Sequence, residues 1–415
     1  MKKAIAFFLL VLLAGCGRDA STRPVEGAYG IQSSELKRVA LAQMDEDDKT
    51  AFSAANRRFA FELFGQLHHE TGNLLFSPYA ISLSFAMLQA GAGGETKAQI
   101  GQSFGFLEDE TAHHGAFNYL SGALEAAGIR SLNALWLQRG FRVEQGFLDT
   151  LALHYGAHAK TVDFAQNPAA AAEAINGWVS AGSEGYVDRI FEADDLTGAQ
   201  LALTNTLVFS GHWKHLFSGY DTALEPFTLL GGESVTVPTM SQSRNLPYHK
   251  EADLAAVRLY YGEGEQSMLL VVPDLGRFAA VEAAINAEKL AQIEANLSTF
   301  YVSLSLPKFS YESSFDLPSA LKTLGVEDAF LPTKADFSRI HATQELFISA
   351  VKHKTRIETD EEGTTTAAAT AIATGPTSPP PAESALLRID RPFLYLILDQ
   401  SGTVLFMGRV VNPLG

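Results

Sequence analysis

Residues 73–100 read NLLFSPYAISLSFAMLQAGAGGETKAQI, and they carry the clearest local signals in the chain. Ser77 followed by Pro78 predicts the start of a helix, because serine caps a helix N-terminus well and proline fits its first turn. A cluster of glycines near the end of the stretch predicts where that helix stops. Between these two signals, three apolar residues recur at helical spacing: Ile81, Phe85 and Leu88.

The segments around this stretch extend the pattern in both directions. Residues 56–70 predict another helix with one apolar face. Residues 201–210 are densely apolar, which predicts a strand covered on both faces, whereas residues 301–309 alternate as a half-buried strand does. Residues 392–411 predict a hairpin that turns at Gln400-Ser401-Gly402. Helices come first and strands later, so the sequence predicts an α+β fold with a large sheet.

Composition limits the partners. The chain has 415 residues, of which 47% are hydrophobic, and its formal net charge is −16 with an isoelectric point of about 5.1. This content of apolar residues suits a globular protein with a large core. An acidic surface repels phosphate backbones, so nucleic acid is not expected as a partner.

The first fifteen residues resemble a lipoprotein signal peptide. Lys2 and Lys3 precede an apolar run that is too short to span a bilayer. The run ends in Leu13-Ala14-Gly15-Cys16, which is similar to a bacterial lipobox, and Cys16 is the only cysteine in the chain. We therefore expect residues 1–15 to be removed and Cys16 to carry a lipid. The alternative is an ordinary signal peptide with an incidental cysteine.

The division of the remaining chain follows from composition. Residues 16–50 are polar and mixed, and they predict a flexible tether in which Asp45-Glu46-Asp47-Asp48 forms a solvated patch. Residues 51–415 predict the folded body. The protein is then an exported lipoprotein of the cell envelope that touches the membrane through the lipid on Cys16. Gly17 and Arg18 follow that cysteine without an aspartate, which favours the outer membrane or the cell surface over the inner membrane.

Motifs for catalysis are not apparent. The adjacent pairs His68-His69 and His113-His114 lack the spacing that puts two imidazoles on one helix face, so we expect surface or helix-end histidines and no metal site. No phosphate-binding glycine loop is apparent in the sequence, and no cofactor is expected. A hydrolase would need a nucleophile–base pair that the sequence does not display. The lack of an apparent catalytic motif favours a binding or conformational role over a catalytic one.

Several segments, taken together and in order, resemble the serpin family. They span about residues 51–415, and they are NLLFSPYAISLSFAMLQAGAGGETKAQI at 73–100, LTNTLVFSGHWKHLF at 203–217, VPTM at 237–240, LPKFS at 306–310, DLPSALKTLGVEDAF at 316–330, LRIDRPFLYLI at 387–397 and LFMGRVVNP at 405–413. The resemblance implies three β-sheets, about nine helices and an exposed reactive-centre loop. It also implies a suicide-substrate inhibitor of serine proteases, which traps the acyl-enzyme when the cut loop inserts into the central sheet.

The resemblance makes residues 361–386 the reactive-centre loop and assigns its hinge to Glu361, Gly363, Thr364, Thr366 and Ala368. An inserting segment must turn small, uncharged side chains inward, because burying a lone charge costs several kcal/mol. One departure is Thr366, where the family usually has alanine, and a buried hydroxyl there is expected to slow insertion. The set that the resemblance turns inward has no charge and consists of Thr364, Thr366, Ala368, Thr370, Ile372 and Thr374.

The bond to be cut is assigned by counting along this loop. The family's usual distance from Gly363 reaches Thr377-Ser378, and neighbouring bonds involve prolines that serine proteases accept poorly. Counting backward from Pro392 reaches Pro381-Ala382 instead. Thr377 before the cut implies an elastase-like or subtilisin-like protease with a small, apolar specificity pocket.

The resemblance also implies latches that hold the loop back. Ser77, Asn205 and His353 match the family's shutter beneath the central sheet, with Ala80 where a second serine is usual. Trp213 and Lys308 match the breach, where insertion begins, and Lys308 is expected to pair with Glu361. We expect a monomer. The alternative is a non-inhibitory serpin that serves as a binding or scaffold protein, and Thr366 and the proline-rich end of the loop favour that alternative.

Overall fold

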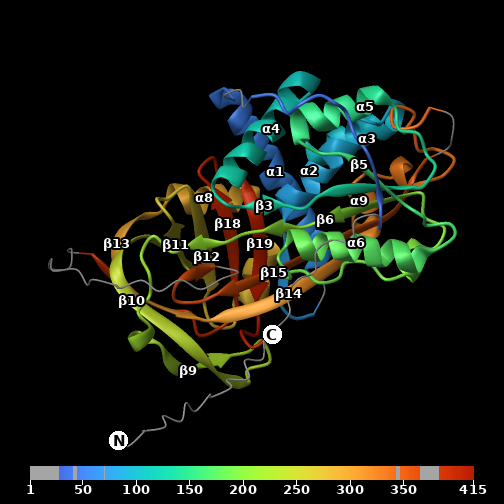
Figure 1. Ribbon diagram of the computed structural model, residues 1–415. Coiled ribbons are helices and arrows are strands. Elements are labelled where there is room, and N and C mark those ends of the chain that lie inside the picture. Colours follow the sequence, from blue (N-terminus) through green and yellow to red (C-terminus); the bar gives the residue numbers. More distant parts are fainter. Residues whose placement is uncertain (1–27, 41–43, 70, 343–345, 365–382) are drawn as a thin grey trace, which may run out of the picture.

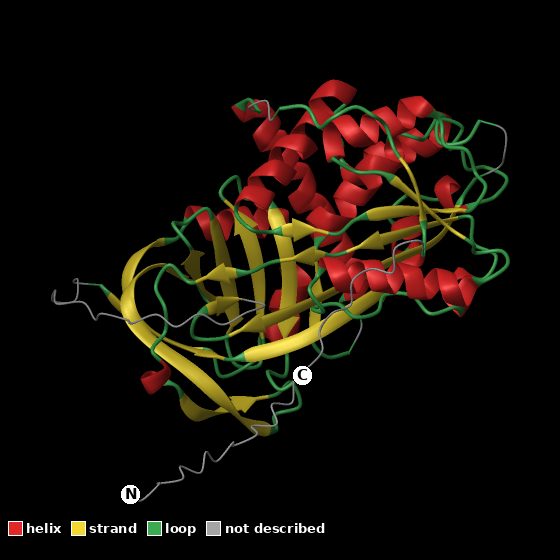
Figure 2. Cartoon of the chain, in the orientation of Figure 1, coloured by secondary structure: helices red, strands yellow, loops and turns green. Residues whose placement is uncertain are grey.

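The computed structural model describes residues 28–40, 44–69, 71–342, 346–364 and 383–415. Most helices gather at one side of the molecule, and long strands fill the other side (Figure 1; Figure 2). The α-helices of the described residues are α1 (Glu46–Leu67), α2 (Pro78–Gln89), α3 (Gly94–Phe104), α4 (Glu110–Ala126), α5 (Gln145–Thr150), α6 (Pro168–Gly182), α7 (Phe278–Ala284), α8 (Ala287–Ala295) and α9 (Pro318–Thr323).

The strands form three sheets among the described residues. The central sheet runs in the order β1 (Gly30–Gln32), β5 (Ala159–Val162), β4 (Ala134–Gln138), β6 (Leu201–Asn205), β15 (Ile348–Thr359), β16 (Gly363–Thr364) and β8 (Gly211–His212), with β14 (Phe309–Asp316) also paired to β15. The larger sheet runs β17 (Ser384–Arg388), β13 (Ser298–Pro307), β10 (Ser234–Lys250), β11 (Leu254–Tyr261), β12 (Gln266–Pro273), β18 (Phe393–Asp399), β19 (Val404–Val410) and β2 (Leu74–Phe76), with β9 (Ala223–Thr228) on β10. The third sheet is the pair β3 (Arg130–Ser131) and β7 (Leu207–Val208).

The predicted fold class is confirmed. The described residues contain nine α-helices and three sheets, as the sequence resemblance implied. The predicted hairpin is β18 and β19, and β13 alternates in burial as expected. The strand predicted at 201–210 is broken, since β6 ends at Asn205 and β7 begins at Leu207.

Helix α2 lies at the centre of the molecule. The Ser77 hydroxyl accepts a hydrogen bond from the Ala80 N–H and Pro78 occupies the first turn, as predicted. Every residue of the helix is buried, because α2 contacts both β6 of the central sheet and β19 of the larger sheet. Two sheets therefore share one apolar helix as their common packing surface.

Helix α6 covers the opposite face of the central sheet (Figure 1). Ile175 and Val179 of α6 pack in one apolar cluster with Trp136, Ala202 and Ala350 from three of its strands. The central sheet is therefore sandwiched, and its strands are apolar on both faces, as expected for a doubly covered sheet.

The N-terminal part of the body differs from the sequence prediction. Helix α1 begins at Glu46, because Asp45 caps it and accepts a hydrogen bond from the Asp48 N–H at 2.7 Å. The acidic run expected to be a solvated patch in a tether is therefore a cap and first turn. Carboxylates in that position stabilise the helix, because they interact favourably with the positive end of its dipole.

Residues 28–40 also pack against the body, although they were predicted to belong to a flexible tether. Strand β1 adds an edge to the central sheet by pairing with β5. The Gln32 side chain donates to the Phe141 carbonyl at 2.6 Å and accepts from the Val143 N–H at 3.0 Å. Arg38 donates to both Asn118 and Glu125 on α4. These contacts explain why the segment packs on the body: Gln32 satisfies two backbone groups that would otherwise lie unpaired, and Arg38 binds two side chains of α4.

Replacing Arg38 with alanine is expected to lower the free energy of unfolding by about 1–2 kcal/mol, because a half-buried guanidinium loses charge-assisted hydrogen bonds to two partners. Urea unfolding followed by circular dichroism measures this change. The matched control is Lys37→Ala, since Lys37 is exposed and next in sequence. Equal unfolding midpoints for both variants would show that residues 28–40 do not stabilise the body.

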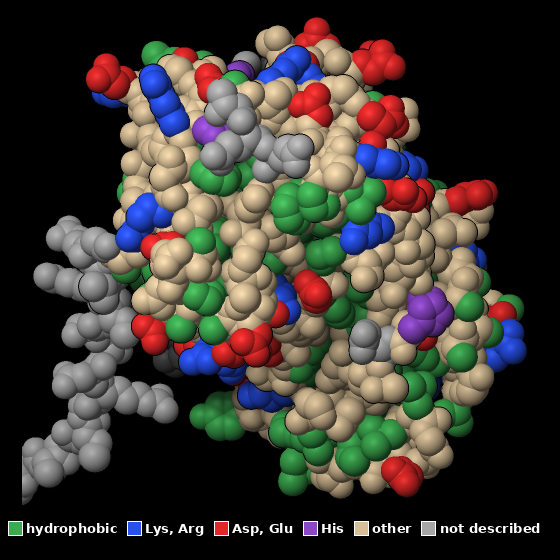
Figure 3. All heavy atoms as spheres, turned by 90° about the vertical axis from the view of Figure 1, so that its right-hand side faces the viewer, with side chains coloured by type: hydrophobic (Ala, Val, Ile, Leu, Met, Phe, Trp, Pro, Cys, Tyr) green, Lys and Arg blue, Asp and Glu red, His purple; other side chains and the backbone are tan. Residues whose placement is uncertain are grey.

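The surface carries charges of both signs. On the face seen from the right-hand side of Figure 1, acidic and basic side chains are interspersed (Figure 3). Such a face has a mixed potential rather than one strong field. Among the described helices, none is both long and apolar enough to cross a bilayer.

Candidate functional site: the hinge and the cleft in the central sheet

The segment Glu361–Thr364 enters the central sheet at one end. Gly363 and Thr364 form β16, which lies between Thr359 of β15 and residues 211–212 of β8. The turn before it is closed by Asp360, whose carboxylate accepts from the Glu362 N–H at 2.9 Å and whose N–H donates to the Gly363 carbonyl at 2.9 Å. The first two residues of a possible extra strand are thus already in place.

Thr364 turns its side chain inward. It is buried, and its hydroxyl lies 2.7 Å from the Tyr261 hydroxyl and 3.2 Å from the Thr359 hydroxyl. A buried hydroxyl with two partners is satisfied, so this position accepts threonine at little cost. Side chains alternate along a strand, which makes Thr364 the described start of the set assigned to the inward face.

Gly363 sits where no side chain fits. A Cβ atom at this position would lie 2.1 Å from the Gly211 carbonyl oxygen and 2.8 Å from the His212 Cα. These neighbours are backbone atoms, so they cannot swing aside as a flexible side chain could. Glycine is required here because the hinge backbone passes directly against β8.

Trp213 clamps the turn that precedes β16. Its indole N–H donates to the Asp360 carbonyl at 2.9 Å, and its backbone N–H donates to the Glu362 carbonyl at 2.8 Å. The indole stacks on Tyr261, with ring centroids 4.5 Å apart and an interplanar angle of 13°. Tyr261 therefore touches both the clamp and the inward hydroxyl of Thr364.

The predicted ion pair between Lys308 and Glu361 is present. The Lys308 ammonium lies 2.6 Å from one carboxylate oxygen of Glu361, and the Thr222 hydroxyl donates to the other at 2.7 Å. Partial burial raises the pKa of Glu361, but the hydrogen bonds from Lys308 and Thr222 outweigh it and leave the pKa below its ordinary value. Glu361 is therefore ionised at neutral pH and ties the base of the loop to β13 and β14.

Replacing Glu361 with lysine is expected to release this end of the loop, because two ammonium groups would then face each other. We expect about fivefold faster loss of monomer during mild heating, after allowing for the partial exposure of the pair. Native gels at timed intervals measure the monomer band. Glu358→Lys is the matched control, since Glu358 is exposed on β15 and its contact with Arg356 is 3.9 Å long. If the Glu361 variant loses monomer no faster than this control, the ion pair with Lys308 does not hold the base of the loop.

A cleft in the strand ladder continues from β16. Strand β15 pairs with β6 from Ile348 to His353, and on the same side the described strands pair with it again only at Thr359. Within the described residues, several buried polar atoms along this cleft have no hydrogen-bond partner, among them the Thr206 and Thr355 hydroxyls and the Asn205 side-chain oxygen. Unpaired polar groups beside an interrupted ladder are sites that an added strand could satisfy.

The shutter residues meet at the closed end of this cleft. His353 of β15 lies opposite Asn205 of β6, and its Nε2 accepts a hydrogen bond from the Ser77 backbone N–H at 2.9 Å. Burial lowers the pKa of His353 to about 3, so the imidazole is neutral at pH 7. A protonated ring could not accept the Ser77 bond, and the contact therefore holds only the neutral form. Ala80, which replaces the usual second serine, bonds through its backbone alone.

Several residues to which the sequence analysis assigned a role cannot be placed in the structure. Thr366, Ala368, Thr377, Ser378 and Cys16 lie outside the described residues.

The expectation for His113 and His114 is wrong, because α4 packs them into the body and both are buried. Burial lowers their pKa values to about 3 and about 4. Among the described residues, no cluster of three or more metal-ligating side chains is arranged to hold an ion.

Sequence reasoning missed three partners of the hinge: Tyr261, Thr222 and Asp360. Tyr261 and Thr222 come from distant parts of the chain, whereas Asp360 directly precedes the hinge, and no local pattern marks any of the three. Gly211 could have been singled out, since it sits between Phe209 and Trp213 in a segment already recognised.

Comparison with known proteins identifies this architecture. The family model described as serpin (serine protease inhibitor) matches residues 54–413. The chain belongs to the serpin family. Serpins are mostly serine protease inhibitors rather than catalysts.

Sequence relatives align with most of this chain. A serpin-like protein of Thermococcus kodakarensis is 35% identical over 98% of this chain and 97% of its own length. The leukocyte elastase inhibitor of Homo sapiens is 34% identical over 87% of this chain and 99% of its own. Among solved structures, the thermophilic serpin tengpin in its native state matches with a TM-score of 0.81 and 26% identity, covering 92% of this chain and 99% of tengpin.

Proposed function

We propose that this serpin is a suicide-substrate inhibitor of serine proteases with a small, apolar specificity pocket, of the elastase or subtilisin type. The protease cuts the loop and forms an acyl-enzyme. The cut loop then extends β16 along the cleft beside β15, and the protease is carried away and deformed before it can release itself.

One observation carries this proposal. Gly363 and Thr364 already occupy the first positions of an extra strand beside β15. Between Thr359, which pairs with Thr364, and His353, where the pairing with β6 ends, β15 lacks a partner on that side among the described strands. The next residues of the inward set are uncharged, so extension along the cleft buries no lone charge. The unpaired groups at Thr206, Thr355 and Asn205 lie along the same path.

The choice of protease rests on the sequence of the loop. Lys and Arg are absent between Gly363 and Leu387, which disfavours a trypsin-like enzyme. Thr377-Ser378 is the proposed bond, with Pro381-Ala382 as the alternative. Relatives named leukocyte elastase inhibitor add support for an elastase-like target.

The place of action follows from the N-terminus. We propose that Cys16 is lipidated and anchors a monomeric inhibitor in the cell envelope, at the outer membrane or the cell surface. Metabolic labelling with a clickable fatty acid tests this proposal. Label that survives in a Cys16→Ser variant would contradict it.

The deciding experiment mixes the purified protein with neutrophil-type elastase and, separately, with subtilisin. Denaturing gels and the mass of the released C-terminal peptide are the two readouts. A band at the summed mass that resists SDS, together with a peptide starting at Ser378, would establish both trapping and the bond. A peptide starting at Ala382 would move the bond, and trypsin trapped faster than elastase would overturn the specificity.

A second function remains open because Thr366 brings a hydroxyl into the inward set and three prolines follow at 379–381. The hydroxyl of Thr366 disfavours full insertion, and the prolines leave a protease few usable bonds, so both features suit a serpin that binds a partner without trapping a protease. Melting the protein before and after loop cleavage separates the two functions. A sharp rise in melting temperature after cleavage indicates insertion, and an unchanged temperature favours the binding protein.

A further inference from the structure

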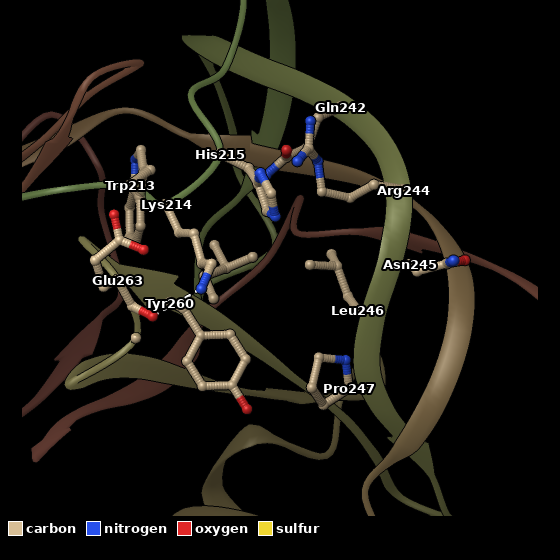
Figure 4. Close-up of a pocket in the computed structure, with 12 residues that line it drawn as sticks. Trp213, Lys214, His215, Gln242, Arg244, Asn245, Leu246, Pro247, Tyr260 and Glu263 are labelled. Atoms are coloured by element: carbon tan, nitrogen blue, oxygen red, sulfur yellow. Dashed lines mark hydrogen bonds between the residues drawn. The ribbon is translucent and has the colours of Figure 1, made fainter. Parts of the chain in front are cut away.

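A pocket of about 350 Å³ opens beside the segment that clamps the hinge. Its walls come from Trp213–His215, from the bend of β10 at Gln242–Pro247, and from Leu259–Gly264 at the end of β11 and the turn that follows (Figure 4). A cavity of this size suits a small organic molecule. None of the described residues of the reactive-centre loop, at 361–364 and 383–386, lines it.

Arg244 is the unusual residue of this pocket. Its side chain is half-buried, with Nε fully buried, and the guanidinium has no hydrogen bond or ion pair with any described residue. Burial lowers its pKa, yet a guanidinium stays charged at any pH the protein meets. A partly desolvated charge without an acceptor is costly, which makes Arg244 a site that an external anion would stabilise.

The neighbouring groups add to the positive potential. Figure 4 shows the Arg244 guanidinium beside His215 and Gln242, while Lys214 extends from the same segment as His215. Lys214 donates to the Glu263 backbone carbonyl at 2.7 Å, so it is fixed at the pocket wall. Burial, and then the charges of Arg244 and Lys214, lower the pKa of His215, which is the response of an imidazole to nearby cations.

Apart from Asn245 and Glu263, the rest of the pocket lining is mainly apolar. Leu246 points into its centre in Figure 4, and Pro247, Leu259 and the Tyr260 ring line it further. Glu263 is its only acidic lining residue, and it contributes a backbone carbonyl to Lys214. A ligand would therefore meet a cationic end and an apolar body in one cavity.

We infer that this pocket binds a small organic carboxylate. The carboxylate would accept hydrogen bonds from Arg244, with Lys214 as the second cation, and the aryl or alkyl body would lie against Leu246 and Leu259. The uncharged amide of the same molecule would gain the apolar contacts but leave Arg244 unpaired. Charge should therefore account for most of the selectivity.

Isothermal titration calorimetry on the full chain tests this inference with naphthalene-2-carboxylate and naphthalene-2-carboxamide as probes. We expect the carboxylate to bind and the amide to bind at least about tenfold more weakly. Arg244→Gln should weaken carboxylate binding by at least about tenfold and leave amide binding unchanged. The control is Arg142→Gln, which removes an exposed arginine away from the pocket and should change neither value.

A second variant keeps the test sound if Arg244→Gln folds poorly. Lys214→Gln removes the other cation at an exposed position and should weaken the carboxylate severalfold. Three outcomes would overturn the inference: no carboxylate binding, equal affinity for acid and amide, or full affinity in a folded Arg244→Gln protein.

Discussion

Replacing Thr364 with arginine is expected to convert the inhibitor into a substrate. Thr364 is buried, and its hydroxyl bonds to Tyr261 and Thr359, so the site has neither room nor a counter-charge for a guanidinium. Burying an unpaired charge costs several kcal/mol, which is enough to slow loop insertion by more than about a hundredfold. The protease should then complete deacylation before it is trapped.

The measurement is the fraction of elastase recovered as SDS-resistant complex, compared with the fraction of serpin that is cleaved. Thr365→Arg is the matched control, because adjacent residues of a strand face opposite sides and this position belongs to the outward set. We expect the Thr364 variant to be cleaved without complex and the Thr365 variant to trap within about twofold of the parent. Equal trapping by both variants would refute insertion along this face.

Acid is expected to destabilise the fold well above the pH at which carboxylates titrate. Burial lowers the pKa of His353 to about 3, of His113 to about 3 and of His114 to about 4, whereas an unfolded histidine titrates near 6.5. The unfolded chain therefore takes up these protons first as pH falls. Their contribution to stability is complete above pH 6.5 and is lost as pH falls to about 4 for His114 and about 3 for His113 and His353, by roughly 1 kcal/mol per pH unit for each histidine.

The test is the urea midpoint measured from pH 7.5 to 5, where Glu361, with its lowered pKa, stays ionised. His353→Gln should reduce the pH dependence of the unfolding free energy by about one proton, because glutamine does not titrate. The fold should be kept, since a glutamine oxygen can still accept the Ser77 N–H bond. His158→Gln is the control, since His158 is exposed. An unchanged slope in the His353 variant would mean that this imidazole does not remain neutral in the fold.

Much of the fold could be predicted because its signals are local or shared by a family. The Ser77-Pro78 start of α2 and the β18–β19 hairpin follow from capping and turn chemistry. The family resemblance supplied the number of sheets and helices, which local patterns cannot provide. It also brought together Lys308 and Glu361, which lie far apart in the sequence.

What could not be predicted depends on contacts without a local pattern. Residues 28–40 mix polar and apolar residues without a clear period, and they are held by the pairing of β1 with β5 and by hydrogen bonds such as those of Gln32 and Arg38. His113 and His114 are adjacent on a helix, which suggested exposure, but α4 is buried on more than one side. The hinge partners Tyr261 and Thr222 are set by tertiary packing alone.

The clamp at Trp213 gives this serpin an intrinsic optical probe of its loop. The chain has three tryptophans, and Trp136 of β4 and Trp178 of α6 form an edge-to-face pair where this helix packs on the central sheet, with ring centroids 5.6 Å apart. Trp213 alone bonds to the hinge turn and stacks on Tyr261. Extension of β16 would change the surroundings of this one indole, so its emission would follow insertion in real time without any attached dye.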